Sequence, residues 1–443
     1  LVHRPAREAA LARWRARSAA RVGEIGQRQV GDAVSGRRAG LLRTRGVVLG
    51  RLDRAYLCDD SDRHVLLVGP TRSGKGIGVI IPTLLVWRES ALVLDAKNGE
   101  NYDISAAWRR LLGPVYAFTP MQGPQTRINV LDTVRLKTPQ EFGDAQMIAQ
   151  SLVAPEKMAR ESQTGLHFRE LASLLLTTAI LHVLYTSRRK SLAGVWGFLT
   201  QQHKSLAEAL KVMSSTEHLS GGVHQSIVSM TRAIQNITGD RELSSVWTTA
   251  IRPLVLYSDP HVAKSTDASD LDFHDLQHGS TPMSLYLIAP SPMALERLHP
   301  IYRVILDVAM TRLMEYKVRT WNYRLLNVCD EMPWYGYTRA IDKGIAVKAG
   351  YGMRDLLVTQ DLESLWDVYG PHTAIWGNSG TKILFAPTND LTAKRISENM
   401  LGAGTVETPV MQQSPVLGWR KSVSLGHHGR ALLTADELMS LPR

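Results

Sequence analysis

Residues 69–76 read GPTRSGKG and match the spacing of a phosphate-binding loop, G-x-x-x-x-G-K. Glycines let consecutive backbone N–H groups turn inward around phosphate oxygens, and a following helix adds positive potential at its first turn. The Lys75 ammonium then reaches the β- and γ-phosphates of a nucleoside triphosphate. The pattern predicts an ATP site formed by Gly69, Pro70, Thr71, Arg72, Ser73, Gly74, Lys75, Gly76 and Ile77.

The residue after Lys75 is a glycine, whereas this loop usually carries Ser or Thr there. The usual hydroxyl is a magnesium ligand. With Gly76 in its place, magnesium must be held through water, through Ser73 or Thr71, or through a carboxylate elsewhere in the chain. The alternative, a structural glycine-rich turn, is disfavoured because a strand-like run precedes the loop and a helix-like run follows it.

Two adjacent carboxylates, Asp330 and Glu331, follow the apolar run 324–329. A P-loop hydrolase needs such an acidic strand end facing the phosphates. We assign Asp330 to magnesium, held through water, and Glu331 to polarising the attacking water. Gln360, which ends the run 355–359, is a third catalytic candidate beside Lys75 and Glu331, because it could contact the γ-phosphate or the water. Taken alone, each of these polar residues also fits a solvated strand end.

Asp95 and Lys97 follow another apolar run, 91–94. In a parallel sheet the end of this run lies at the same edge as the phosphate-binding loop, where ligands bind. The two residues are therefore candidates for the neighbourhood of the site. A charged surface loop is an equally good interpretation of the same residues.

These residues depend on a sheet that the pattern also predicts. Short apolar runs are separated mostly by helix-compatible sequence, which indicates βαβ units and an α/β fold with a mostly parallel central sheet. Residues 156–252 contain no proline and are amphipathic, so an all-α insertion is expected at 138–262, with helix starts at Thr138 and Ser205. The predicted strands are 64–68, 91–94, 114–118, 283–289, 324–329, 355–359 and 382–385.

Composition limits the class of protein. The 443 residues are 44% hydrophobic and 21% charged, which excludes disordered and collagen-like chains, and only Cys58 and Cys329 occur, which argues against dependence on disulfides. The net charge is +11, and residues 1–45 hold eleven Arg against three acidic residues. Such a basic block suits a nucleic-acid arm or the cytoplasmic flank of a membrane span. The most apolar window, 171–185, is too short to cross a bilayer.

Several motifs in order resemble the TraG-type coupling proteins of type IV secretion and conjugation systems. They are GPTRSGKGIGVIIPTLL, SALVLDAKNGEN, LLNVCDEMP, AGYGMRDLLVTQDLESLWDVYG and the ending RALLTADELMSLPR. The resemblance covers nearly all of the chain after about residue 45. It implies a RecA-like P-loop domain with an inserted all-α domain, and ATP hydrolysis that powers or licenses substrate transfer.

The resemblance also implies roles and boundaries. Lys75 and its loop match the family's phosphate-binding motif, Asp330 and Glu331 match its acidic pair, and Gln360 matches a glutamine in the following strand. The family's Asp-Pro-Lys-Gly-Glu departs here to Asp-Ala-Lys-Asn-Gly-Glu at 95–100, which puts the role of Asp95 and Lys97 in doubt. The implied division is a basic segment at 1–57, a RecA-like domain at 58–137 and 263–443, and the all-α domain at 138–262.

From the resemblance we expect a hexamer at the cytoplasmic face of the bacterial inner membrane, of which this chain is the soluble part. The expected partners are a relaxase–DNA complex or effector proteins, other inner-membrane components of the secretion system, and DNA without sequence specificity. Two alternatives remain: a substrate receptor in which nucleotide is a structural or switching ligand, and an FtsK-like DNA translocase. The candidates for a cation that completes the neighbouring subunit's site are Lys348, Arg354 and Arg339.

Overall fold

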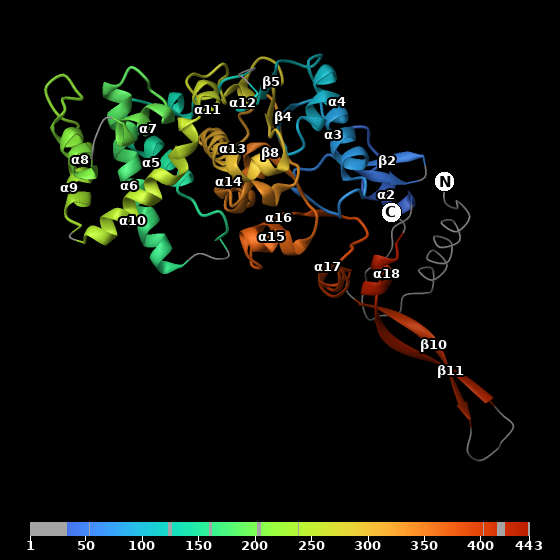
Figure 1. Ribbon diagram of the computed structural model, residues 1–443. Coiled ribbons are helices and arrows are strands. Elements are labelled where there is room, and N and C mark those ends of the chain that lie inside the picture. Colours follow the sequence, from blue (N-terminus) through green and yellow to red (C-terminus); the bar gives the residue numbers. More distant parts are fainter. Residues whose placement is uncertain are drawn as a thin grey trace.

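The computed structural model contains a twisted sheet flanked by helices, with a helical region beside it and a long ribbon extending from the body (Figure 1). The predicted basic segment at 1–57 lies mainly outside the described residues, since residues 1–32 are not among them. The structure describes residues 33–52, 54–122, 126–158, 162–201, 205–237, 239–401, 403–413 and 421–441.

The central sheet has seven strands in the order β5-β6-β4-β7-β8-β3-β9, and each neighbouring pair is parallel. All seven predicted strands are present within about two residues of their expected ends, so the predicted α/β fold is confirmed. The strands are β3 (Val65–Val68), β4 (Ser90–Asp95), β5 (Val115–Phe118), β6 (Ser284–Ile288), β7 (Leu325–Cys329), β8 (Met353–Thr359) and β9 (Thr381–Leu384).

Both faces of the sheet are covered, which explains why its strands are continuous apolar runs instead of alternating ones. In β3, Leu66 and Val68 belong to one hydrophobic cluster, whereas Val65 and Leu67 belong to the other. The first face packs against α13 (Pro292–Leu313), and the second packs against the helices α3 (Ile81–Val86) and α4 (Glu100–Arg109) that follow the P-loop and β4.

The inserted helices lie to one side of the sheet and are drawn in green in Figure 1. Serine side chains accept the capping hydrogen bond at the start of α6, α7 and α8, including the predicted cap Ser205. The predicted start at Thr138 is wrong, because residues 138–140 form a turn and the helix begins at Glu141. The helices are α5 (Glu141–Leu152), α6 (Gln163–Thr186), α7 (Leu192–Thr200), α8 (Leu206–Ser215), α9 (Gln225–Gln235) and α10 (Asp240–Ile251).

The apolar window at 171–185 lies in a longer helix than expected: α6 is the one described helix long and apolar enough to cross a membrane by length and composition. Of its most apolar window, 67% is buried within the protein, where α5, α9 and α10 contact it. Its apolar residues are therefore accounted for as the core of the helical region.

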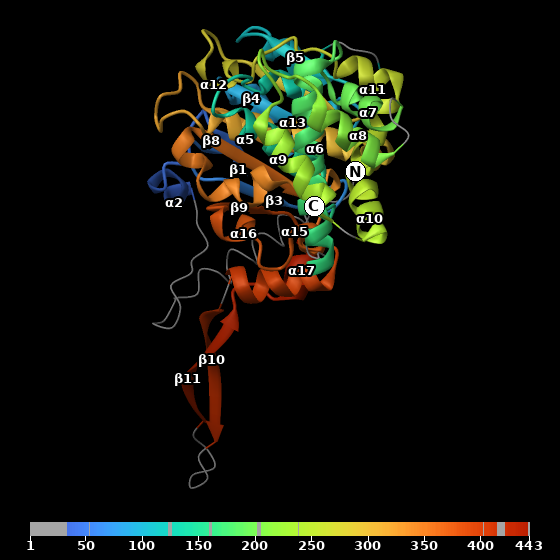
Figure 2. The same cartoon turned by 90° about the vertical axis from the view of Figure 1, so that its left-hand side faces the viewer.

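The last part of the chain includes an antiparallel ribbon, β10 (Ala403–Gln413) and β11 (Lys421–Ala431), that extends away from the body in both views (Figures 1 and 2). A second small antiparallel pair, β1 (Val47–Leu52) and β2 (Ala55–Asp59), lies near the start of the described chain. The remaining α-helices are α2 (Ala33–Arg38), α11 (Pro260–Ser265), α12 (Asp275–His278), α14 (Arg339–Asp342), α15 (Leu362–Tyr369), α16 (Ala374–Asn378), α17 (Asp390–Arg395) and α18 (Ala435–Met439).

Candidate nucleotide-binding site

Strand order brings the predicted site residues to one edge of the sheet. Val68 at the end of β3 pairs with Thr359 of β8, so the residues that follow, Gly69 and Gln360, emerge side by side. Leu94 of β4 pairs with Cys329 of β7, and Asp330 donates its backbone N–H to the carbonyl of Leu94 at 3.2 Å. The carboxyl ends of four strands, β3, β4, β7 and β8, therefore meet where an open α/β sheet binds ligands.

The loop after β3 has the shape its glycines predict. Arg72 and Gly74 have left-handed backbone conformations, with φ of 62° and 93°. A Cβ atom on Gly69 would lie 2.9 Å from the Phe385 side chain and 3.0 Å from Ser73 Oγ, so a larger residue does not fit there. The chain then enters a π-helical turn, η1 (Gly76–Ile80), that continues into α3. A Gly-rich turn running into a helix start is the arrangement that binds phosphate oxygens through backbone N–H groups.

Lys75 lies inside this loop and is only 5% exposed. Its Nζ donates to the carbonyl oxygens of Gly69, at 2.5 Å, and Pro70, at 3.3 Å, and lies 3.4 Å from Oε1 of Glu331. The same ammonium group thus connects the loop to the acidic pair across the sheet. This contact places the two predicted halves of the site together.

Both carboxylates of the pair are buried, Asp330 at 2% exposed and Glu331 at 6%. Glu331 has a left-handed backbone (φ 52°) and immediately precedes a 3-10 turn, η5 (Met332–Tyr335). Burial raises the pKa of Glu331, the charge of Lys75 opposes that rise, and Asp330 adds to it. A carboxyl group with a raised pKa beside a buried lysine of the glycine-rich loop is suited to general-base work.

Gln360 joins the P-loop to the acidic pair. Thr71 Oγ1 donates to Gln360 Oε1 at 3.1 Å, and a hydrogen bond from the Gln360 side chain acts to lower the pKa of Glu331. The alternative interpretation of Gln360 as a solvated strand end does not account for these contacts, because its amide contacts both parts of the site.

The sequence allowed two interpretations of Asp95 and Lys97, as site residues or as part of a surface loop. In the structure both residues lie in the site. The buried Asp95 carboxylate accepts the backbone N–H groups of Asn101 at 2.9 Å, Tyr102 at 3.0 Å and Lys97 at 3.3 Å. Burial raises the pKa of Asp95 to about 6, against the effect of these hydrogen bonds. The residue inserted relative to the family motif is accommodated where Asn98 and Gly99 take φ of 54° and 86°.

Sequence reasoning assigned no role to Asn101, whose Nδ2 donates to Asp330 Oδ2 at 3.4 Å. Asn101 lies in the first turn of α4, and its side chain is almost fully buried. The signal in the sequence was weak, because an asparagine near a helix start is ordinary. The contact depends on the pairing of β7, which Asp330 follows, with β4.

The side chains present fit a magnesium ion. Asp330 Oδ1 and Ser73 Oγ are buried and have no hydrogen-bond partner, and oxygen ligands of this kind are those that Mg²⁺ prefers. No cluster of three His, Cys, Asp or Glu residues within the described part of the chain could hold a metal by itself. Magnesium usually binds nucleotide sites through one or two carboxylates plus phosphates, so this donor set agrees with a nucleotide-bound ion.

Two of the three candidates for a cation acting in trans are internal. Lys348 is fully buried 3.1 Å from Asp355, and Arg354 is buried with its guanidinium 2.8 Å from Asp59. A buried, paired charge cannot reach a neighbouring subunit, so the suggestion of Lys348 and Arg354 was wrong. Arg339 is exposed and donates to Gln150 Oε1 at 2.9 Å.

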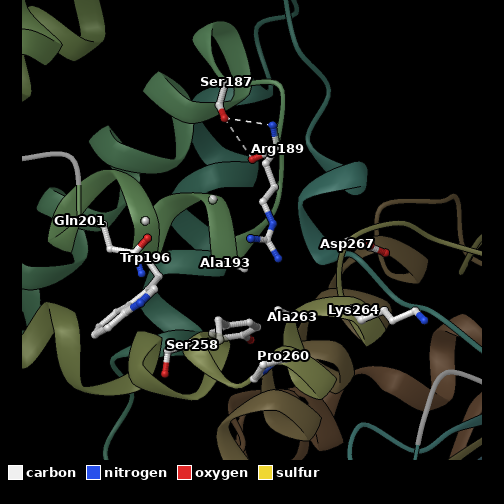
Figure 3. Close-up of a pocket in the computed structure, with 13 residues that line it drawn as sticks. Ser187, Arg189, Ala193, Trp196, Gln201, Ser258, Pro260, Ala263, Lys264 and Asp267 are labelled. Carbon is white, nitrogen blue, oxygen red and sulfur yellow. Dashed lines mark hydrogen bonds between the residues drawn. The ribbon is translucent and has the colours of Figure 1, made fainter.

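A cavity in the described part of the chain lies away from these residues. It measures about 430 Å³ and lies between α7, the 3-10 segment η4 (Arg252–Ser258) and α11. Figure 3 shows its wall, to which Arg189, Lys264 and Asp267 bring charge and Trp196 and Tyr257 bring aromatic surface. None of the predicted site residues lines it.

The family model described as type IV secretory system conjugative DNA transfer matches residues 20–443. Similar relatives include the conjugal transfer protein TraG of Escherichia coli, 32% identical over 411 residues, and VirD4 of Agrobacterium fabrum, 26% identical over 419 residues. These matches cover 87% and 90% of this chain, and the chain spans about 63% and 59% of the two relatives.

The solved structures of the conjugative coupling protein TrwB have the same fold. The form in complex with sulphate has a TM-score of 0.72 at 17% identity, covering 96% of this chain and 91% of that one. The complex with ADP and Mg²⁺ has a TM-score of 0.70 at 17% identity, covering 96% and 89%.

The parallel sheet, the loop closed on Lys75 and the opposed carboxylates define a P-loop protein of the RecA-like class. Within that class, the family match over residues 20–443 is decisive. The chain belongs to the type IV secretory system conjugative DNA transfer family, the TraG-type coupling proteins.

Proposed function

We propose that this chain is the ATP-hydrolysing part of a type IV coupling protein, which recruits and energises the transfer of substrates to the secretion channel. The observation that carries the proposal is the 3.4 Å approach of Lys75 Nζ to Glu331 Oε1. Through this contact the loop at 69–77 faces the acidic pair at 330–331, which supports the proposal. The family membership and the nucleotide complexes of TrwB support the same conclusion.

Each residue has a role in this proposal. The backbone N–H groups of the loop and of η1 hold the phosphates, and the Lys75 ammonium neutralises their charge. Magnesium, when bound with the nucleotide, draws charge from the phosphate oxygens, and Asp330 and Ser73 supply the protein oxygens that would hold it. Glu331 accepts a proton from water, and Gln360 orients that water from the adjacent strand.

The assembly and location belong to the same proposal. We propose that the chain acts as a hexamer at the cytoplasmic face of the bacterial inner membrane, with relaxase–DNA complexes or effector proteins as cargo and other inner-membrane components as partners. The basic segment at 1–57 would bind DNA or anionic lipid without sequence specificity. We also retain the division into a RecA-like domain at 58–137 and 263–443 and an all-α domain at 138–262.

The test is Lys75→Ala, measured by calorimetry with ATP and magnesium and by phosphate release. We expect hydrolysis to fall by at least about 100-fold, because a preorganised charge facing the phosphates is lost. Lys394→Ala is the matched control, since Lys394 is an exposed lysine paired with Asp390 on α17. Unchanged hydrolysis in Lys75→Ala would remove the proposal.

One observation favours a second function, a substrate receptor in which nucleotide is a structural or switching ligand. The position after Lys75 is Gly76, with no hydroxyl to bind magnesium, although a Cβ atom there would meet nothing within 4 Å. The chain thus lacks a usual metal ligand where space exists for it. Substrate transfer that survives the loss of hydrolysis would identify the receptor.

A further inference from the structure

A second lysine faces the acidic pair. Lys97 Nζ lies 3.4 Å from Asp330 Oδ2 and 3.8 Å from Glu331 Oε1. Asp330 Oδ2 also accepts from Asn101 Nδ2 at 3.4 Å, and Glu331 Oε1 also faces Lys75. The two carboxylates therefore meet two ammonium groups, of which the phosphate-binding motif accounts for only one.

The backbone that carries Lys97 is fixed in place. Asp95 Oδ1 accepts the Lys97 N–H at 3.3 Å, and the next residue, Asn98, donates its N–H to the Ala289 carbonyl at 3.0 Å. Two left-handed residues, Asn98 and Gly99, then turn the chain into α4. The position of Lys97 beside the pair therefore follows from the end of β4 and is more than a chance contact of a surface lysine.

Lys97 differs from its partners in exposure. Its side chain is 40% exposed, whereas the Asp330 and Glu331 side chains are 2% and 8% exposed. The buried carboxylates need a cation, because an unpaired buried charge is costly. The lysine can withdraw into solvent when another cation arrives, since 40% of its side chain is already exposed.

We propose that Lys97 is a positioning residue that neutralises the acidic pair in the nucleotide-free protein and competes with the divalent cation for Asp330. The inference rests on the proposed function, because it takes Asp330 as the residue that holds magnesium. As a consequence, the nucleotide-free protein binds divalent metal weakly. The metal enters together with nucleotide, whose phosphates supply the remaining ligands.

The experiment measures Mn²⁺ binding to the nucleotide-free chain by electron paramagnetic resonance, which counts free Mn²⁺ directly. We expect Lys97→Met to bind Mn²⁺ about fivefold more tightly than the natural chain, in keeping with the strength of a partly exposed ion pair. Lys97→Arg retains the charge and should bind Mn²⁺ as the natural chain does. Lys394→Met, which removes an exposed and ion-paired lysine on α17, should also change nothing.

Equal or weaker Mn²⁺ binding by Lys97→Met would overturn the proposal, as would the absence of bound Mn²⁺ in both proteins up to millimolar metal. Thermal unfolding of each variant checks that the fold is retained. Calorimetry of the natural chain with ATP and magnesium separates the two conclusions. No binding there removes the proposed function, whereas normal binding there with unchanged Mn²⁺ affinity in Lys97→Met removes only the role of Lys97.

Discussion

Oε1 of Glu331 lies 3.4 Å from Nζ of Lys75, although strands β4, β5 and β6 and the helical region separate the two residues in sequence. The contact exists because β3 and β7 both flank β8. The Lys75 ammonium is shared between the Gly69 carbonyl and the acidic pair. If nucleotide binds as proposed, its phosphate oxygens would replace these partners of the ammonium group.

Glu331→Gln tests the division of labour in the acidic pair. We expect hydrolysis to fall by about 100-fold or more, because the amide cannot accept the proton of the attacking water. Nucleotide binding should persist, because Lys75 and the loop are untouched. Phosphate release and calorimetry on the same preparation check this. Equal loss of both quantities would mean that Glu331 is needed to shape the site, and normal substrate transfer in this variant would favour the receptor function.

Gly76→Ser tests how magnesium is held. The added Cβ meets nothing within 4 Å, so the variant should fold normally. Its hydroxyl restores the usual metal ligand, and we expect a lower magnesium concentration at half-maximal ATP binding. Gly143→Ser is the control, because Gly143 lies in α5 with equally open space around it. Its magnesium dependence should match the natural chain, and a shift of the same size in both variants would contradict the prediction.

The variants Lys348→Met and Arg339→Ala distinguish a structural role of the first residue from a catalytic role of the second. Lys348 and Asp355 form a fully buried ion pair, so removing the lysine should destabilise the protein by about 3–5 kcal/mol. Arg339 is exposed, and its loss should change stability by no more than about 0.5 kcal/mol. Urea unfolding measures both. Reduced hydrolysis by a stable Arg339→Ala hexamer would identify a group contributed in trans, and unchanged hydrolysis would exclude it.

The stability of the protein should fall as pH falls below about 6.5. His64 is buried, and burial holds the pKa of its imidazole below the ordinary value of 6.5 although Asp355 acts in the other direction. The folded protein therefore binds fewer protons than the unfolded chain in this range. The stability is present above 6.5 and is lost as pH falls toward the folded pKa, by up to about 1.4 kcal/mol per pH unit for one proton.

The pH effect is measured by urea unfolding at pH 5, 6 and 7 in the natural chain and in His64→Asn. The asparagine oxygen can accept the Asp355 N–H that His64 Nδ1 accepts at 3.0 Å, and it does not titrate. We expect the variant to lose less stability between pH 7 and pH 5 than the natural chain does. Parallel curves would show that the imidazole of His64 does not cause the loss.

Much of the site was predictable because its parts are local. The loop spacing at 69–76, the carboxylates after β7 and Gln360 after β8 each follow a strand, and strand ends can be recognised from short apolar runs. Ser205 likewise marks the start of its helix, since a cap needs only its next three residues. These features depend on neighbouring residues and not on distant parts of the chain.

The seven strands, the loop at 69–76 and the acidic pair could be recognised without a structure, because each depends on a few neighbouring residues. The contacts of Lys97 and Asn101 with Asp330, and the internal ion pairs of Lys348 and Arg354, depend instead on tertiary packing. Their partners lie on other strands, and strand order depends on how the whole sheet packs. No local pattern specifies which of several charged residues becomes buried against another.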